Sequence, residues 1–356
     1  MREIRISDRS SGQRLDKFLQ RYLPGATVGF LYKMLRKKNI LLNGKRAAGR
    51  EMLSEGDLLT LYFSEDTIAH FQDRTKAQQQ GTDKDPTFHA YPSLDPSMIV
   101  YEDERLLLVN KPAGMLSQKA QRDDRSLPEY VIGYLREHRG LNEQDRLFYT
   151  PGPANRLDRN TSGLVAVPLT LHAAQELAAL IRDHRMSKEY LALAHGHCSG
   201  EMYFHDRMIR ANGVSHILSD KDIAGRSHEG VDKSRELRMR CRPLCHVPSC
   251  EKTEEEGGLS LLLVTLLTGR THQIRSQLAY HGMPLVGDPK YGGSYISFDK
   301  RMGMKRQFLH SFRLCFPETQ GLFSDLSGRC FTAPLPSDAM RFLERAGIRP
   351  PVDPDR

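Results

Sequence analysis

The 356-residue sequence contains no tryptophan, so phenylalanine and tyrosine provide all of its aromatic residues. No apolar run is long enough to cross a bilayer, and the polar stretch 1–14 lacks the apolar segment of a secretory signal peptide. The six cysteines show no framework spacing, which argues against a disulfide-stapled scaffold and favours a reducing compartment. No repeat of solenoid type is visible either. We therefore expect a cytoplasmic protein that does not enter the membrane.

The positive charge is concentrated at one end of the chain. The net charge is +8 and the isoelectric point is about 9.1, which indicates a polyanionic partner. Residues 1–63, called the basic module below, hold 13 Lys and Arg against 6 Asp and Glu, a net charge of +7. The chain is long enough for two or three domains, and we expect this module to be one of them.

The basic module begins with two helical patterns. Apolar residues recur at helical spacing over 15–23 and 28–35, and the second helix is predicted to end in the basic run 36–38. Asn43-Gly44 is typical of a type I′ hairpin turn, and a last strand is predicted over 58–63.

Two short helices with a basic end, followed by a small sheet, resemble the S-four-like RNA-binding domain. The stretches that carry this resemblance are Arg14-Leu15-Asp16-Lys17-Phe18-Leu19, Leu35-Arg36-Lys37-Lys38, Asn43-Gly44-Lys45-Arg46 and Glu55-Gly56-Asp57. The resemblance implies contacts to RNA phosphates, whereas the simpler alternative is a solvated basic face without a partner. The candidate RNA-binding residues are Arg14, Lys17, Arg36, Lys37, Lys38 and Lys45.

A change of composition separates the basic module from the rest. Residues 64–97 are predicted to be a flexible linker, because the stretch 76–86 is polar and aperiodic, although a plain interdomain loop fits as well. The main domain is predicted over 98–347, with an irregular, insertion-like stretch over 198–259 and a tail over 348–356.

The stretch 155–164 is the most informative part of the main domain. Asp158 stands between Arg156 and Arg159 and shortly before the apolar run 164–167, which is predicted to be a buried strand. A carboxylate held beside guanidinium groups stays ionised and can act as a nucleophile or a base. The simpler alternative is an aspartate that caps a turn.

A strand predicted over 187–193 puts Lys188 and Tyr190 on one face. An exposed tyrosine there is a candidate stacking platform for a nucleic-acid base, and ordinary strand packing is the simpler alternative. Further along, Thr271 is predicted to cap a helix on which His272 and Arg275 are i, i+3 neighbours.

One group of cysteines invites comparison with metal sites. Cys241, Cys245, His246 and Cys250 have the spacing Cys-x3-Cys-His-x3-Cys, which is not a standard zinc pattern. We therefore predict no metal site.

Taken together, the main-domain motifs resemble the RluA-type pseudouridine synthases, in which an S-four-like domain in front is common. One departure is Asn155, which stands where that family often has histidine, and it affects local hydrogen bonding. The stretches that carry the resemblance are Lys111-Pro112-Ala113-Gly114, Arg156-Leu157-Asp158-Arg159-Asn160-Thr161-Ser162-Gly163-Leu164, Lys188-Glu189-Tyr190, Gly269-Arg270-Thr271-His272-Gln273-Ile274-Arg275, His281-Gly282, Gly287-Asp288 and Leu309-His310.

This resemblance implies an α+β fold, with a mixed, mostly antiparallel sheet and flanking helices behind the small S-four-like domain. It also implies that Asp158 attacks the uridine, that Arg275 orients it, and that Tyr190 stacks on the uracil and helps to remove the C5 proton. The implied substrate-binding residues are Arg156, which would enter the RNA stack, Leu309, which would pack against the base, Lys188 and His272.

The implied reaction breaks the N1–C1′ bond of a uridine and forms a C5–C1′ bond. Nothing is oxidised or added, so we expect no cofactor and no metal. The base must leave its stack to reach the carboxylate. We expect a monomer that acts on RNA, with ribosomal RNA favoured over transfer RNA because the basic module suits a large structured RNA.

Two other functions remain open at this point. An RNA-binding or ribosome-assembly factor without catalysis would use the Asp158 loop only for structure. A glycosidase or nucleotide hydrolase would need two paired carboxylates, and only one well-placed aspartate is visible.

Overall fold

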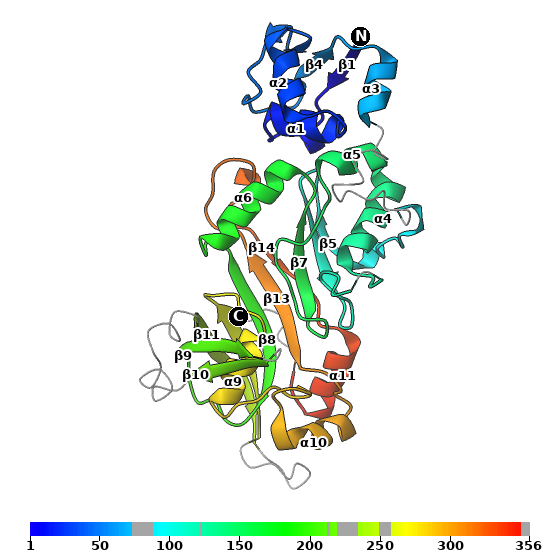
Figure 1. The fold of residues 1–356 in the computed structure, drawn as a ribbon. Coiled ribbons are helices and arrows are strands. Elements are labelled where there is room, and N and C mark those ends of the chain that lie inside the picture. The colour runs from blue at the N-terminus through cyan, green and yellow to red at the C-terminus, as the bar shows by residue number, and fades with distance from the viewer. Residues whose placement is uncertain (73–87, 122, 212–213, 219–233, 249–257, 350–356) are drawn as a thin grey trace. The chain divides into compact units, whose positions relative to one another are not determined.

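The computed structural model describes residues 1–72, 88–121, 123–211, 214–218, 234–248 and 258–349 (Figure 1). These residues form two compact units. The first comprises the described parts of Met1–Leu107, Ala120–Ala154 and Ala166–Ala179, and it joins the basic module to parts of the predicted main domain. The second comprises Leu108–Lys119, Asn155–Val165 and the described chain from Leu180 onward.

In the basic module, two helices share one core with a small antiparallel sheet of order β1-β4-β2-β3. Leu15, Phe18 and Leu19 are buried because the helical period places them on one face. Asn43 and Gly44 have φ angles of 51° and 70°, which confirms the type I′ turn. Strand β1 is an element that the sequence patterns did not predict. The elements are β1 (Arg2–Arg5), α1 (Leu15–Tyr22), α2 (Val28–Arg36), β2 (Ile40–Leu42), β3 (Lys45–Arg46) and β4 (Leu58–Leu61).

The predicted linker 64–97 is wrong at its N-terminal end. Helix α3 (Glu65–Gln72) follows the module, and its Ile68 is fully buried in the module's core. The amide of Gly25 donates to the carbonyl of Phe71 at 2.8 Å, which fastens α3 to the α1–α2 connection. Burial of the apolar Ile68 side chain thus stabilises a helix in a segment whose other residues are mostly polar. The stretch 76–86 lies outside the described residues.

The module also packs against helix α5 (Glu143–Phe148) of the same unit. The ring of Phe148 stacks on that of Phe18, with 4.5 Å between centroids and 6° between planes. Arg21 donates to the carbonyl of Phe148 at 2.7 Å, and Arg9 pairs with Asp145 at 2.9 Å. These contacts fix the module to the first unit through an apolar stack and polar bonds around it.

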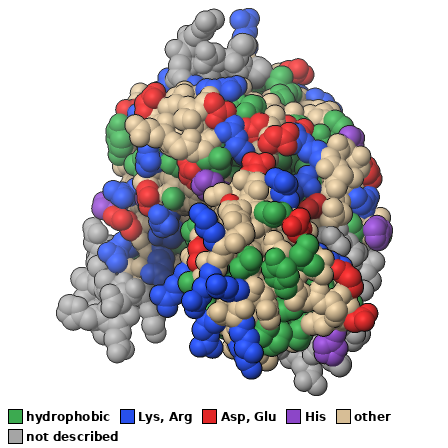
Figure 2. Space-filling model, turned by 90° about the horizontal axis from the view of Figure 1, so that it is seen from above, with side chains coloured by type: hydrophobic (Ala, Val, Ile, Leu, Met, Phe, Trp, Pro, Cys, Tyr) green, Lys and Arg blue, Asp and Glu red, His purple; other side chains and the backbone are tan. Residues whose placement is uncertain are grey.

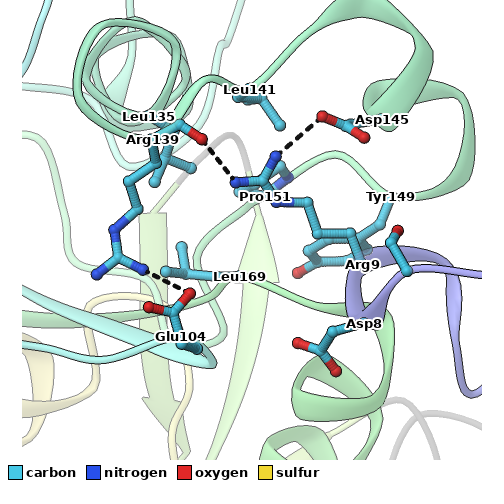
Figure 3. Close-up of a pocket in the computed structure, with 11 residues that line it drawn as sticks. Asp8, Arg9, Glu104, Leu135, Arg139, Leu141, Asp145, Tyr149, Pro151 and Leu169 are labelled. Carbon is cyan, nitrogen blue, oxygen red and sulfur yellow. Dashed lines mark hydrogen bonds and ion pairs between the residues drawn. The ribbon is translucent and has the colours of Figure 1, made fainter. Parts of the chain in front are cut away.

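A cavity of about 230 Å³ lies beside these contacts, between the module and α4 (Leu127–Arg139) with α5 (Figure 3). Arg9 reaches across it to Asp145, and Arg139 pairs with Glu104 at 3.2 Å. Burial raises the pKa of Asp8 at its edge. Both arginines are already paired with carboxylates, and none of the predicted site residues lines the cavity.

Replacing Phe148 with alanine should loosen the module from α5. The change removes the stack on Phe18, a loss that we expect to cost about 2 kcal/mol. Amide hydrogen exchange should show faster exchange in α5 while the amides of α2 and β4 keep their protection. Phe71→Ala is the matched control, because Phe71 packs on Phe30 within the module and not on α5. Unchanged exchange in α5 of the Phe148 variant would contradict this attachment.

The second unit is built on a large sheet of order β10-β9-β11-β12-β8-β13-β7-β6, with β14 beside β13. Neighbouring strands from β10 to β13 pair antiparallel, while β13 and β7 pair in parallel. The predicted α+β class with a mixed, mostly antiparallel sheet is therefore confirmed. The strands, with β5 of the first unit, are β5 (Ile99–Glu102), β6 (Leu106–Lys111), β7 (Ser162–Pro168), β8 (Ser187–His195), β9 (Met202–Ala211), β10 (Val214–Leu218), β11 (Arg235–Val247), β12 (Leu259–Leu266), β13 (Leu309–Cys315) and β14 (Cys330–Thr332). The remaining helices are α6 (Leu171–Arg182), α9 (Gln273–Tyr280), α10 (Ile296–Arg301) and α11 (Ser337–Arg345).

The predicted irregular stretch 198–259 is wrong where it is described. It forms β9, β10 and β11, and the first half of β11 alternates, with Leu237, Met239 and Cys241 buried. The arginines between them hid this period, because an alternating strand with charged outer positions has low mean hydropathy. Cys250 and the charged segment 251–257 lie outside the described residues.

The C-terminal part is more ordered than a tail. Ile348 is 2% exposed and packs with Phe342 and Leu343 of α11, so the predicted tail begins too early. Cys315 and Cys330 form a disulfide between the paired strands β13 and β14, which the scattered cysteine spacing did not indicate. Among the described helices, none combines the length and the apolar character needed to span a bilayer.

Candidate active site

Asp158 lies in the second unit, in the loop before β7. The amide of Thr161 bonds to the backbone carbonyl of Asp158 at 3.0 Å, not to its carboxylate. The carboxylate instead accepts a hydrogen bond of 2.9 Å from Arg275 and remains 23% exposed. Asp158 is therefore not the cap of this turn, and its side chain is directed to a charged partner with one side open to solvent.

Two features hold the Asp158 loop in place. The hydroxyl of Ser117 bonds to both the amide and the carbonyl of Leu157, at 3.0 and 2.8 Å. Gly163 has a φ angle of 111°, and a Cβ there would collide with the backbone of Ser311 on β13. Only glycine lets β7 approach β13 this closely directly after the loop.

Arg275 on α9 is shared between two carboxylates. Its Nε and one terminal nitrogen donate to Asp288 at 2.7 and 2.8 Å, and the other terminal nitrogen donates to Asp158. Burial alone would lower the pKa of Arg275, but the bonds and charges of Asp288 and Asp158 outweigh it and raise that pKa. The bidentate pair fixes the guanidinium plane, so that one N–H points at Asp158.

Asp288 is a site residue to which sequence reasoning gave no role. It is fully buried, and its Oδ1 also accepts from the amides of Lys290 and Tyr291 at 2.9 and 3.1 Å. The available signal was a carboxylate in the quoted Gly287-Asp288 motif, which follows an apolar segment. Its partner is 13 residues away, which no local pattern shows.

His272 stands at the N-terminus of α9 with a φ angle of 59°. Its Nδ1 lies 3.1 Å from the Tyr291 hydroxyl and its Nε2 lies 3.7 Å from Asp158, while burial lowers its pKa. The prediction that Thr271 caps this helix is wrong, because His272 occupies the cap position without a side-chain bond to the helix. The left-handed backbone turns its ring toward Asp158, and histidine tolerates that conformation better than most residues.

Tyr190 is brought to the site on β8, but it is not the exposed tyrosine that was predicted. It is 6% exposed, and it lies beside Val264 and Ser311 on the neighbouring strands. Burial, together with the charge of Asp158, raises its pKa to about 12. The phenol is thus protonated at neutral pH. Leu309, 5% exposed and opposite Ala192 on the same face, adds an apolar wall.

Lys111 is hydrogen-bonded to the loop that carries Asp158. It is fully buried, and its ammonium donates to the carbonyls of Pro112, Met115 and Arg159 at 3.0, 2.9 and 3.3 Å. Burial lowers its pKa to about 7, with Arg306 adding to the effect and Asp158 opposing it. The three bonds tie the turn after β6 to the loop that carries Asp158.

The predicted RNA contacts fall into two groups. Arg156 is exposed beside the site and bonds only loosely to Gln118, at 3.3 Å. On the face that Figure 2 shows, Lys and Arg side chains gather toward the lower left. Arg14 pairs with Asp16 at 2.7 Å and is still largely exposed. The six candidate residues of the basic module belong to the first unit, and none of them is among the groups around Asp158. All six are exposed: Arg14, Lys17, Arg36, Lys37, Lys38 and Lys45.

Of the cysteine group, Cys241, Cys245 and His246 lie on β11. Cys241 is buried, which raises the pKa of its thiol to about 12, and Cys245 is half-buried. No group of three or more His, Cys, Asp and Glu suited to a metal ion occurs within the described ranges.

Comparison with known proteins connects this geometry to a family. The model of the RNA pseudouridylate synthase family matches residues 105–280, which include Asp158, Tyr190 and Arg275. The ribosomal large subunit pseudouridine synthase C of Salmonella typhi is 30% identical over 88% of each chain, and that of Escherichia coli K12 is 29% identical over 88% of each. The structure of human RNA pseudouridylate synthase domain containing 4 has the same fold. Its TM-score is 0.54 at 17% identity, and the match covers 72% of this chain and 95% of that one.

Proposed function

This chain belongs to the RNA pseudouridylate synthase family, and from that premise we propose that it isomerises specific uridines of large-subunit ribosomal RNA. The observation that supports a catalytic rather than structural Asp158 is its carboxylate, which is aimed by Arg275, is free of turn capping and is partly open to solvent. The relatives named above are ribosomal large subunit enzymes, which favours ribosomal over transfer RNA. We also propose that the protein acts in the cytoplasm and as a monomer.

In the proposed reaction the Asp158 carboxylate forms a covalent bond to the uridine while the N1–C1′ bond breaks. The uracil turns so that C5 reaches C1′, the C5–C1′ bond forms, and the bond to Asp158 breaks, which regenerates the free carboxylate. The proton on C5 is released to solvent while N1 gains one. Arg275 keeps Asp158 charged and aimed, and the aromatic face of Tyr190 with Leu309 holds the base. Because the Tyr190 phenol is protonated at neutral pH, we assign it stacking and not removal of the C5 proton.

The other residues are proposed to bind RNA. Arg156 is exposed next to Asp158 and would fill the space that the flipped base leaves in the stack. His272 borders Asp158 and would contact the uridine. The six exposed cations of the basic module would bind RNA phosphates, which adds affinity without sequence readout.

The test uses a transcript of large-subunit ribosomal RNA that carries tritium at C5 of its uridines. The purified full-length protein should release tritium in amounts equal to a small whole number of uridines per transcript. Mapping of pseudouridines in cellular RNA with and without the gene should identify the same positions. A transfer RNA transcript is the comparison, because release from it alone would change the assigned substrate. No release from either RNA, with an unchanged map, would overturn the proposal.

A further inference from the structure

Lys188 is an unusual lysine. It is only 9% exposed, and within the described chain its ammonium has no hydrogen bond and no ion pair, although its tip still contacts solvent. Lys111, which is fully buried, donates to three carbonyls. A lysine is rarely buried unless it is paired, because loss of water costs its charge several kcal/mol. The fold therefore loses free energy by burying an ammonium to which it provides no hydrogen-bond acceptor and no carboxylate within the described chain.

The position of Lys188 connects it to the active site. It lies on β8 two residues before Tyr190, so both side chains are on one face of the strand. Leu314 is its neighbour on β13 and gives apolar packing for the stem. Burial is the cause that lowers the pKa of Lys188. Lys188 thus lies on the same face of β8 as Tyr190, and burial reduces the hydration of its ammonium.

The ammonium lies next to Gly269, which begins the loop that leads to His272 and Arg275. A Cβ built on Gly269 would have the Nζ of Lys188 as its single neighbour within 4 Å, at 3.6 Å. Gly269 and Arg270 are both exposed. The absence of a side chain at 269 therefore leaves the ammonium open to the solvent side of this loop.

We propose that the Nζ of Lys188, left uncovered by Gly269, binds a phosphate oxygen of the RNA beside the uridine that reaches Asp158. This inference rests on the proposed RNA substrate. A phosphate oxygen carries a negative charge that can pair with the unpaired, poorly hydrated ammonium, whereas a uracil carbonyl is neutral and would pair with it less strongly. Exposed Arg270 next to Gly269 adds a second positive charge on the same rim.

The first test replaces Lys188 with methionine, which keeps the stem and removes the charge. Binding of the full-length protein to the ribosomal RNA transcript is measured at several salt concentrations. We expect about fivefold weaker binding near 0.1 M salt, and a slope of log K against log salt that is smaller by about 0.7 to 0.9, the value for one phosphate. Folding should survive, because the change removes an unpaired buried charge, and a melting curve checks this.

A second pair of variants tests the site without touching Lys188. Gly269→Asp places a carboxylate beside the ammonium, while Gly269→Asn has the same size and no charge. The backbone at 269 is not in the left-handed region, so both side chains are accommodated. The aspartate variant should weaken binding and reduce the slope like Lys188→Met, and the asparagine variant should keep the full slope.

An unchanged slope in both Lys188→Met and Gly269→Asp would overturn the phosphate site. An unchanged slope together with reduced tritium release would also overturn it, because Lys188 would then act on the base. A reduced slope in a protein that releases no tritium would support the phosphate site while removing the proposed enzymatic function. The salt dependence of binding thus tests the phosphate site, and tritium release tests the enzymatic function independently.

Discussion

Replacing Asp158 with asparagine should lower tritium release from C5-labelled transcripts by about 10⁴-fold, while RNA binding and stability stay close to those of the wild type. The amide has the same shape, and its oxygen still accepts the 2.9 Å bond from Arg275. It lacks the negative charge and the nucleophilic oxygen that a covalent bond to the uridine requires. The reaction therefore loses its first bond-forming group and little else.

Single-turnover release with enzyme in excess measures this loss without interference from product dissociation. Asp103→Asn is the matched control, since Asp103 is also a half-buried carboxylate paired with an arginine, Arg105, at 2.6 Å, and lies outside the site. The control should keep its rate. If Asp158→Asn retained a tenth of the wild-type rate, Asp158 would be structural, and the non-catalytic RNA-binding function would become the better explanation.

Local patterns predicted the parts of this fold that depend on local physics. The helix over 15–23 and the Asn43-Gly44 turn follow from side-chain period and from backbone preference, and both appear as α1 and the β2–β3 hairpin. The strand over 187–193 appears as β8. Ile68 shows the limit, because a single buried side chain orders a helix inside a polar segment.

Features that depend on distant partners were less accessible. Asp158 and Arg275 are 117 residues apart, and their pairing was expected only from a family resemblance, not from spacing. Burial of Tyr190 depends on the strands that flank β8, so its protonation state could not be derived from its own neighbours in sequence. The partner of Asp288 could not be derived from its neighbours in sequence, and the structure supplies its role through one shared guanidinium.

That shared guanidinium predicts a large effect for Asp288→Asn. The amide can accept one bond from Arg275 but loses the charge of the bidentate pair, so the guanidinium plane is no longer fixed. Misplacement of a catalytic group by about 1 Å costs on the order of 10²-fold in rate, and we expect a fall in kcat of that size. Weakening a buried pair should also lower the free energy of unfolding by about 3 kcal/mol.

Glu189→Gln is the control that distinguishes a loss of Arg275 positioning from a loss of protein stability. Glu189 is 10% exposed, accepts a bond from Arg313 at 2.6 Å and lies on β8, on the opposite face from Tyr190. Its loss should lower the free energy of unfolding, measured by urea denaturation, while kcat in single-turnover release stays unchanged. Asp288→Asn should instead lower kcat with the RNA dissociation constant unchanged, because Asp288 is buried behind Arg275 and does not reach the RNA. Equal kcat in the two variants would mean that Asp288 stabilises the fold without aiming Arg275 at Asp158.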